Sequence, residues 1–173
     1  MFRGWEAFYA LIGSAAGALI GIMFLVATLT AGRDPAQVLR GSRVYITPIV
    51  FHFAVVLVVS IVAEIPNLSI VAADVVLALT AAAGFLYAAV TTVRIYSPGW
   101  REGPDFWDRC FYGFFPLLAY LTLVGTVGLT WTAADTSVYV VDVVGATMIV
   151  LLLIGITNAW DMATTLTQRR SES

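Results

Sequence analysis

The chain has one histidine, His52, and its imidazole is the side chain best suited to move a proton or to bind a metal near neutral pH. His52 stands in the segment TPIVFHF, shortly after Pro48. A proline within a helix frees a backbone carbonyl, which can accept a hydrogen bond from a ring nitrogen. We therefore expect a packed His52 bonded to backbone or to a hydroxyl. A proton relay is the alternative, and haem ligation is a third interpretation that needs an axial ligand from another subunit.

The carboxylates form a second set of candidates, because ionisable groups inside a membrane span are costly and mark functional sites by default. Five lie near one predicted end of the apolar stretches described below: Glu6, Glu64, Asp74, Asp135 and Asp142. A carboxylate at the level of the lipid headgroups stays solvated, so a solvated rim is the simplest interpretation. Asp142 is the deepest, and we expect it to be the one with a buried role. Alternatively, the set draws cations or protons toward an outer vestibule.

A polar face ends the last apolar stretch and supplies further candidates. It consists of Thr157, Asn158, Asp161, Thr164, Thr165 and Gln168. Arg94 closes the third stretch at the same predicted depth, so we expect an ion pair between Arg94 and Asp161. The pair would lock the bundle, and the alternative is a cytoplasmic gate or ligand site. Asn158 joins His52 and Asp142 as a candidate for a polar core or a proton relay.

Motifs for enzymatic chemistry are missing from the sequence. There is no nucleophile–histidine pair, no phosphate-binding glycine loop and no H-E-x-x-H motif. One histidine and one cysteine, Cys110, cannot form an ordinary zinc site. The net charge is −2, and no basic run favours nucleic acid. We therefore expect a protein that is not an enzyme, with no metal, no cofactor and no nucleic-acid partner.

The composition indicates that a lipid bilayer surrounds these side chains. The chain has 173 residues, of which 60% are hydrophobic and 12% charged, and its mean hydropathy is +0.91. Soluble domains carry about 25% charged residues. A helix needs about 20 mostly apolar residues to cross a bilayer, and five stretches qualify: about 7–31, 45–65, 70–95, 111–131 and 138–162. We predict an all-α protein, one polytopic membrane bundle of five transmembrane helices over residues 1–173.

Arginine placement predicts the orientation of these helices. All nine basic residues are arginines, and eight fall on one side if the chain crosses five times: Arg33, Arg40, Arg43, Arg94, Arg101, Arg109, Arg169 and Arg170. The positive-inside rule makes that side cytoplasmic, so the N-terminus lies outside and the C-terminus inside. Arg3 before an apolar run is also typical of a cleaved signal peptide, but the run is longer than a signal core and Glu6 interrupts it early.

Three glycines, Gly13, Gly17 and Gly21, lie four residues apart in the first stretch. In lipid, helices associate through close contact, and small residues at this spacing let two backbones approach. We expect the three glycines to form a helix-packing face. Packing within the chain is the simplest interpretation, self-association is the second, and the lining of a conducting pore is the third.

Two patterns occupy about the first third of the chain. The first helix carries Y-x-x-x-G-S-x-A-x-x-L-x-G-x-x-F and the second T-P-x-x-x-H-F, with the matching residues Tyr9, Gly13, Ser14, Ala16, Leu19, Gly21, Phe24, Thr47, Pro48, His52 and Phe53. In these the chain resembles a group of small, poorly characterised bacterial polytopic membrane proteins. The resemblance implies a bacterial inner membrane. It implies no activity, because the group has no established function.

Two functions from different classes remain. The first is a non-catalytic bundle, a structural, accessory or regulatory subunit that packs on itself or on a membrane-protein partner in the lipid bilayer. The second is a small homo-oligomeric ion or proton channel that uses His52 and the outer carboxylates. The channel hypothesis requires that His52, Asp142 and Asn158 line one water-accessible path. The bundle hypothesis is favoured if His52 is sealed by apolar side chains.

Overall fold

The structure is a computed structural model that describes residues 2–30, 47–96, 106–132 and 137–171. Every secondary-structure element in these ranges is helical: α1 (Glu6–Thr30), α3 (Thr47–Glu64), α4 (Ile70–Ile95), α5 (Phe106–Asp108), the π-helix η2 (Arg109–Phe114), α6 (Phe115–Thr132) and α7 (Ser137–Ser171). Five helical segments are long and apolar enough to cross a membrane. The predicted all-α bundle with five candidate membrane spans is confirmed.

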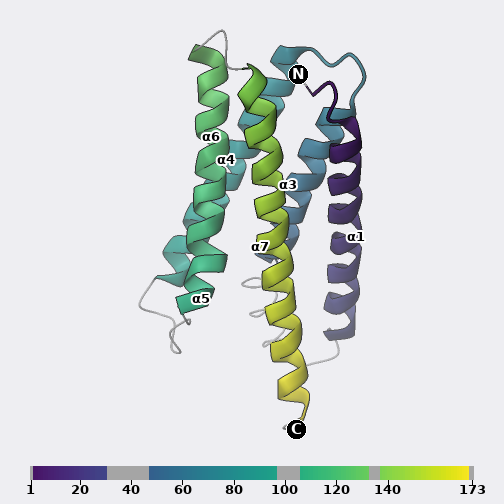
Figure 1. Ribbon diagram of the computed structural model, residues 1–173. Coiled ribbons are helices and arrows are strands. Elements are labelled where there is room, and N and C mark those ends of the chain that lie inside the picture. Colours follow the sequence, from purple (N-terminus) through teal and green to yellow (C-terminus); the bar gives the residue numbers. More distant parts are fainter. Residues whose placement is uncertain (1, 31–46, 97–105, 133–136, 172–173) are drawn as a thin grey trace.

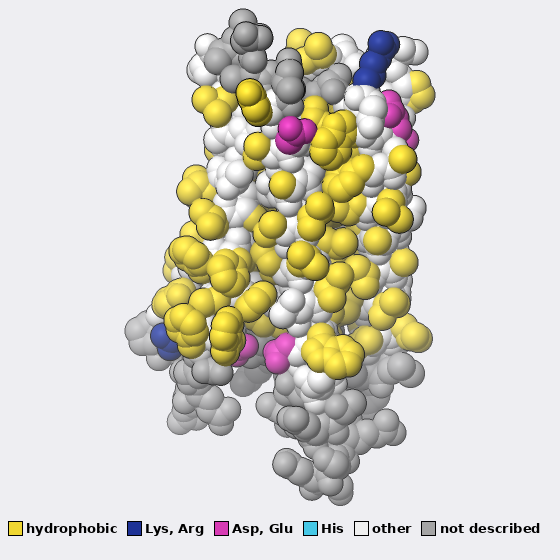
Figure 2. Space-filling view, viewed as in Figure 1, with side chains coloured by type: hydrophobic (Ala, Val, Ile, Leu, Met, Phe, Trp, Pro, Cys, Tyr) yellow, Lys and Arg dark blue, Asp and Glu magenta, His cyan; other side chains and the backbone are white. Residues whose placement is uncertain are grey.

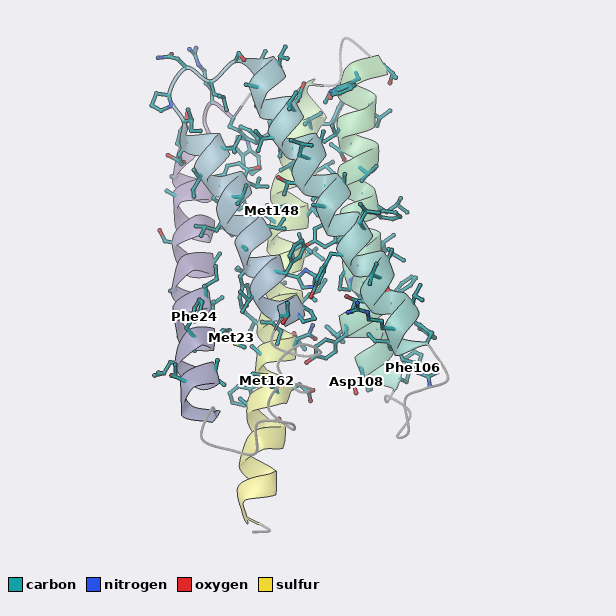
Figure 3. The ribbon with its side chains drawn as sticks, turned by 180° about the vertical axis from the view of Figure 1, so that it is seen from behind. Met23, Phe24, Phe106, Asp108, Met148 and Met162 are labelled. Atoms are coloured by element: carbon teal, nitrogen blue, oxygen red, sulfur yellow. The ribbon has the colours of Figure 1, made fainter. Side chains whose placement is uncertain are left out.

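The helices run up and down in one bundle, as Figure 1 shows. Helix α1 stands at one edge, where it packs chiefly on α3 and to a smaller extent on α7. Helix α4 packs chiefly on α6, and α7 packs on both α6 and α3. Helices α3 and α7 are the most buried of the five spans. Met148 of α7 lies at the centre of the bundle (Figure 3) and is fully buried.

The connection between α3 and α4 is a tight turn, as its short sequence predicts. Asn67 in this turn has a φ of 56°, and asparagine tolerates the left-handed region better than most residues. Ser69 then caps α4, because its side chain accepts a hydrogen bond from the Ala72 amide at 3.2 Å. Helix α4 consequently begins at Ile70 and ends at Ile95, at the bounds that the apolar stretch predicts.

The other helix ends depart from the predicted stretches by small amounts, with two exceptions. The fourth span begins at Phe106 rather than near residue 111, because α5 and η2 continue directly into α6. Helix α7 ends at Ser171, well beyond the predicted 162. Apolar composition predicts where a helix leaves the lipid, whereas a polar helix can continue into water. Tyr45 and Ile46 of the predicted second stretch lie outside the described residues.

The outer surface has the polarity expected of a membrane protein. Hydrophobic side chains cover the middle of the face in Figure 2, while its Asp, Glu and Arg side chains lie toward the two ends. Trp107 and Trp131 are exposed near opposite ends of their span, and Trp160 is exposed near the end of the span Tyr139–Thr164. Tryptophan prefers the headgroup level. The bundle therefore presents an apolar belt between two polar rims.

The topology brings the ends of α1, α4 and α7 to the same end of the bundle (Figure 1). Arg94 and Arg109 belong to this end, whereas Arg3 precedes α1 at the opposite one. Four of the arginines used to predict the orientation, Arg33, Arg40, Arg43 and Arg101, lie outside the described residues, as do the side chains of Arg169 and Arg170. Which end is cytoplasmic therefore stays a prediction.

Candidate functional site

His52 and Tyr120 form a hydrogen-bonded pair inside the bundle. His52 Nδ1 lies 2.9 Å from the Tyr120 hydroxyl oxygen, and the two ring centroids are 5.6 Å apart. Helix α3 supplies the histidine and α6 the tyrosine, and both side chains are almost completely buried. His52 is thus packed and bonded to a hydroxyl, as the first of its three interpretations expects. The partner is a side chain from another helix rather than the backbone near Pro48.

Aromatic rings and one glycine enclose this pair. Phe51 stacks on Tyr87 of α4, with centroids 4.2 Å apart and planes at 20°. Phe51 also meets Tyr120 edge-on at 6.4 Å. Gly84 of α4 lies under the Tyr120 ring, and a Cβ added there would overlap that ring. Helices α3, α4 and α6 therefore share one aromatic layer, and Gly84 makes the room for Tyr120.

Within the part of the chain that the structure describes, the hydrogen bond between His52 and Tyr120 does not continue to a third group. A neutral imidazole has one donor and one acceptor nitrogen, and a tyrosine hydroxyl can serve either. No described group makes a hydrogen bond with the second ring nitrogen, Nε2 of His52. A continuous relay would need a further polar partner at that nitrogen. The geometry favours a structural hydrogen bond between two helices.

Asn158 of α7 forms a second buried polar contact, with η2. Its side-chain Nδ2 donates to the Phe111 carbonyl at 3.2 Å. The Tyr112 hydroxyl in turn donates to the Asn158 carbonyl at 3.2 Å. Both Asn158 and Tyr112 are buried. Two hydrogen bonds thus tie α7 to η2 within the membrane span.

Pro116 explains why the Phe111 carbonyl needs a partner from another helix. A carbonyl in a π-helix is paired with the amide five residues on, and for Phe111 that residue is Pro116, which has no N–H. The amide four residues on belongs to Phe115, and it bonds the Cys110 carbonyl instead. A proline ring also clashes with the carbonyl four residues before it, which favours the wider π turn. Asn158 supplies the missing donor.

Asp142 does not have the buried role predicted for it. It is exposed near the start of α7, whereas its neighbours Val141 and Val144 face the core. The position of a residue along a predicted membrane span does not show which side of the helix the residue occupies. The three residues of the channel hypothesis are therefore not joined: His52 bonds Tyr120, Asn158 bonds Phe111, and Asp142 faces outward.

The predicted ion pair between Arg94 and Asp161 is not formed. Both side chains are exposed, and no hydrogen bond or ion pair joins them in the described ranges. The physical reason is the helix arrangement. Helix α4 packs chiefly on α6, whereas α7 packs chiefly on α6 and α3, and α4 and α7 are not a closely packed pair. Equal depth in the sequence therefore does not bring these two charges together.

The three glycines of α1 divide between two faces. A Cβ added at Gly13 would stand 2.7 Å from the Ser60 Cβ of α3, so Gly13 provides a close helix contact. No described atom lies within 4 Å of a Cβ added at Gly17 or Gly21. A step of four residues turns about 40° around a helix, so the later glycines rotate away from α3. Among the residues that the structure describes, the packing face predicted for all three glycines exists only at Gly13.

Among the described residues outside α1, the two closest glycine contacts are those of Gly84 and Gly155. Gly84 faces Tyr120, and a Cβ added at Gly155 of α7 would overlap the Phe53 ring of α3. Gly155 lies in the fifth predicted stretch, whereas Gly84 stands alone in an alanine-rich segment of the third and gives no sequence signal. Ser60 Oγ is buried without a hydrogen-bond partner beside Gly13. A Cβ added at Gly13 would stand 3.1 Å from this oxygen, so the hydroxyl is enclosed at the close contact between α1 and α3.

Comparison of the chain with models of protein families, with curated proteins and with solved structures finds no match. The resemblance carried by the first two helices therefore remains a proposal. No group of three or more His, Cys, Asp or Glu side chains suited to a metal ion occurs in residues 2–30, 47–96, 106–132 and 137–171.

Proposed function

We propose that this protein is a non-catalytic membrane subunit, structural, accessory or regulatory, that acts by packing on a second copy or on a partner helix in the bilayer. The observation that carries the proposal is the division of the α1 glycines. Gly13 is used within the chain, while Gly17 and Gly21 have no described neighbour within 4 Å of an added Cβ. Glycines cost helix stability in water, and in lipid their benefit is close approach of another helix.

A surface of small residues surrounds these glycines. We call it the α1 outer face, and it comprises Ala10, Ser14, Gly17, Ala18 and Gly21. These residues span about 100° of the helix circumference at 100° per residue. The Ser14 hydroxyl donates a hydrogen bond to the Ala10 carbonyl at 2.7 Å, so this hydroxyl is satisfied within its own helix. The α1 outer face is therefore flat, apolar in effect and located at the edge of the bundle.

Energy transfer between labelled copies in vesicles tests this proposal. We expect transfer above the random-mixing level for the wild type and its loss in Gly21→Leu. Gly125→Leu is a matched control, since an added Cβ at Gly125 of α6 also meets no described atom within 4 Å. It should leave the transfer unchanged. Wild-type transfer at the random-mixing level would contradict self-association.

A small proton channel is the second candidate function. The observation in its favour is an ionisable pair, His52 and Tyr120, buried within the spans. Its weakness is that no hydrogen bond among the described residues extends from this pair to a third group, and that Asp142 faces outward. Proton flux into liposomes distinguishes the two functions. The packing function predicts flux equal to that of empty liposomes, whereas a flux that His52→Ala abolishes would establish the channel.

We further propose that the chain lies in a bacterial inner membrane with its N-terminus outside and its C-terminus in the cytoplasm. The arginine distribution supports the orientation. The two motifs of the first third support the bacterial membrane. The two motifs include Gly13, Gly21 and His52. Gly13 lies against Ser60 of α3, Gly21 has no described atom within 4 Å of an added Cβ, and His52 is buried in the bundle.

A further inference from the structure

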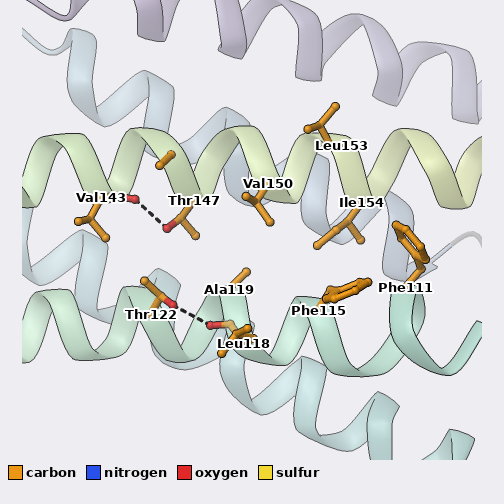
Figure 4. Close-up of a pocket in the computed structure, with 11 residues that line it drawn as sticks. Phe111, Phe115, Leu118, Ala119, Thr122, Val143, Thr147, Val150, Leu153 and Ile154 are labelled. Carbon is orange, nitrogen blue, oxygen red and sulfur yellow. Dashed lines mark hydrogen bonds between the residues drawn. The ribbon is translucent and has the colours of Figure 1, made fainter. Parts of the chain in front are cut away.

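We propose that a groove between α6 and α7 holds one acyl chain of a membrane phospholipid. The groove has a volume of about 480 Å³, within the range of about 300–1,000 Å³ that is usual for small-ligand pockets. Figure 4 shows the two helices and the side chains between them. Helix α1 contributes no lining residue, so this site does not depend on the self-association proposed above.

The lining of the groove presents no free polar group to an occupant. Its only two hydroxyls belong to Thr122 and Thr147. Thr122 Oγ1 donates to the Leu118 carbonyl at 2.9 Å, and Thr147 Oγ1 donates to the Val143 carbonyl at 2.7 Å (Figure 4). Because each hydroxyl is satisfied within its own helix, a polar occupant would lose hydrogen bonds and gain none. The occupant must be apolar.

The shape of the groove fits a single extended chain. Ala119, Thr147 and Ile154 are buried and form its floor, while Leu118 and Leu153 are about half exposed and form its rims. From Val143 to Ile154 the lining follows α7 over eleven residue steps, or about 17 Å at 1.5 Å per residue. One leaflet of hydrocarbon is about 15 Å thick, half of a 30 Å core. The groove therefore has the length of one acyl chain in one leaflet.

The position of the groove fits a lipid whose headgroup stays at the membrane surface. The lining belongs to the spans Phe106–Thr132 and Tyr139–Thr164. A row of rings leads into it, from Trp107 to Phe111 at 6.2 Å and on to Phe115 at 5.2 Å between centroids. Trp107 is exposed, and tryptophan marks the headgroup level. One end of the groove thus lies near the interface and the other inside the hydrocarbon.

Spin-labelled phospholipid tests the site directly. The chain is placed in vesicles of phosphatidylethanolamine and phosphatidylglycerol that contain phosphatidylglycerol labelled near the end of one acyl chain. The number of motionally restricted lipids per protein is then measured. Ala146→Phe fills the groove from an exposed lining position. Ala82→Phe places the same ring on the exposed surface of α4, away from the groove, and is the matched control.

The expected result is one restricted lipid fewer in Ala146→Phe and no loss in Ala82→Phe, with unchanged helical circular dichroism in both. If Ala146→Phe fails to fold, Val150→Trp, which enters from an exposed rim position, replaces it. No loss in the filled variant, or an equal loss in the control, would overturn the proposal. So would disulfide cross-linking of Leu153→Cys to itself in a Cys110→Ser background, because a second copy would then cover the groove.

Discussion

Asn158 of α7 and Phe111 of η2 are joined across the helix interface by a hydrogen bond of 3.2 Å from side-chain amide to backbone carbonyl. The bond exists because Pro116 removes the donor that the carbonyl would otherwise use within its own helix. In lipid an unpaired carbonyl cannot turn to water. A proline in one helix is thus matched by a polar residue in another, and this gives the buried Asn158 a structural role.

Replacing Asn158 should therefore destabilise the bundle. Asn158→Leu leaves the Phe111 carbonyl unpaired and should cost about 1–2 kcal/mol of unfolding free energy, measured by denaturing-detergent titration in micelles. Thr157→Ala is the neighbouring control, since Thr157 is exposed and its hydroxyl bonds its own helix at the Leu153 carbonyl. Equal effects of the two substitutions would show that the amide has no structural role.

The His52–Tyr120 pair should show a measurable coupling energy. Tyr120→Phe removes the hydroxyl but keeps the ring that packs over Gly84. Together with His52→Leu and the double variant it forms a cycle, for which we expect a coupling of about 0.5–1.5 kcal/mol. Tyr139→Phe, at an exposed position, should have no effect. A coupling of zero would contradict a bond between α3 and α6.

The glycines should respond to alanine according to their surroundings. Gly13→Ala and Gly84→Ala force a methyl group against Ser60 and against the Tyr120 ring, and each should cost about 1–3 kcal/mol. Gly17→Ala should leave the unfolding free energy of the isolated chain unchanged or raised, because no described atom meets the methyl group. If Gly17→Ala destabilised the chain as much as Gly13→Ala, the division between two faces would be wrong.

The predicted orientation can be tested with cysteine labelling in the Cys110→Ser background. Asn67→Cys lies in the turn between α3 and α4, at the end opposite Arg94. We expect a membrane-impermeant maleimide to label it in intact cells. Ser171→Cys, at the end of α7, should react only after permeabilisation. Labelling of both positions from outside would contradict the three crossings predicted between them.

Much of the fold could be predicted from the sequence. A helix that crosses a bilayer must be long and apolar, and the polar, glycine- and proline-containing segments between the apolar stretches can be recognised in the sequence. The bounds of α4 follow from Ser69 and the turn before it. The site could be predicted only in part. His52 was identifiable as a buried polar group, but its partner Tyr120 lies 68 residues away and carries no local signal. Depth along the chain does not give the side of the helix, which is why Asp142 was placed wrongly.

The glycines of α1 also show what the sequence alone cannot predict. Spacing by four residues predicts a packing face, and Gly13 uses it within the chain. Whether Gly17 and Gly21 continue that contact depends on how α1 turns relative to α3, which the spacing does not specify. The π-helix likewise required the structure. Pro116 indicates a disturbed helix, but not that Asn158 would repair it.

Disulfide cross-linking between copies tests the central claim most directly, because it reports which surface of α1 meets a neighbour. Single cysteines replace Ser14, Ala18 and Gly21 in the Cys110→Ser background, with Ala82→Cys on exposed α4 as the control. The account predicts cross-linked dimers in vesicles at the three α1 positions and none at Ala82. Dimers at Ala82 as abundant as those at Gly21, or no dimers at any α1 position, would contradict it.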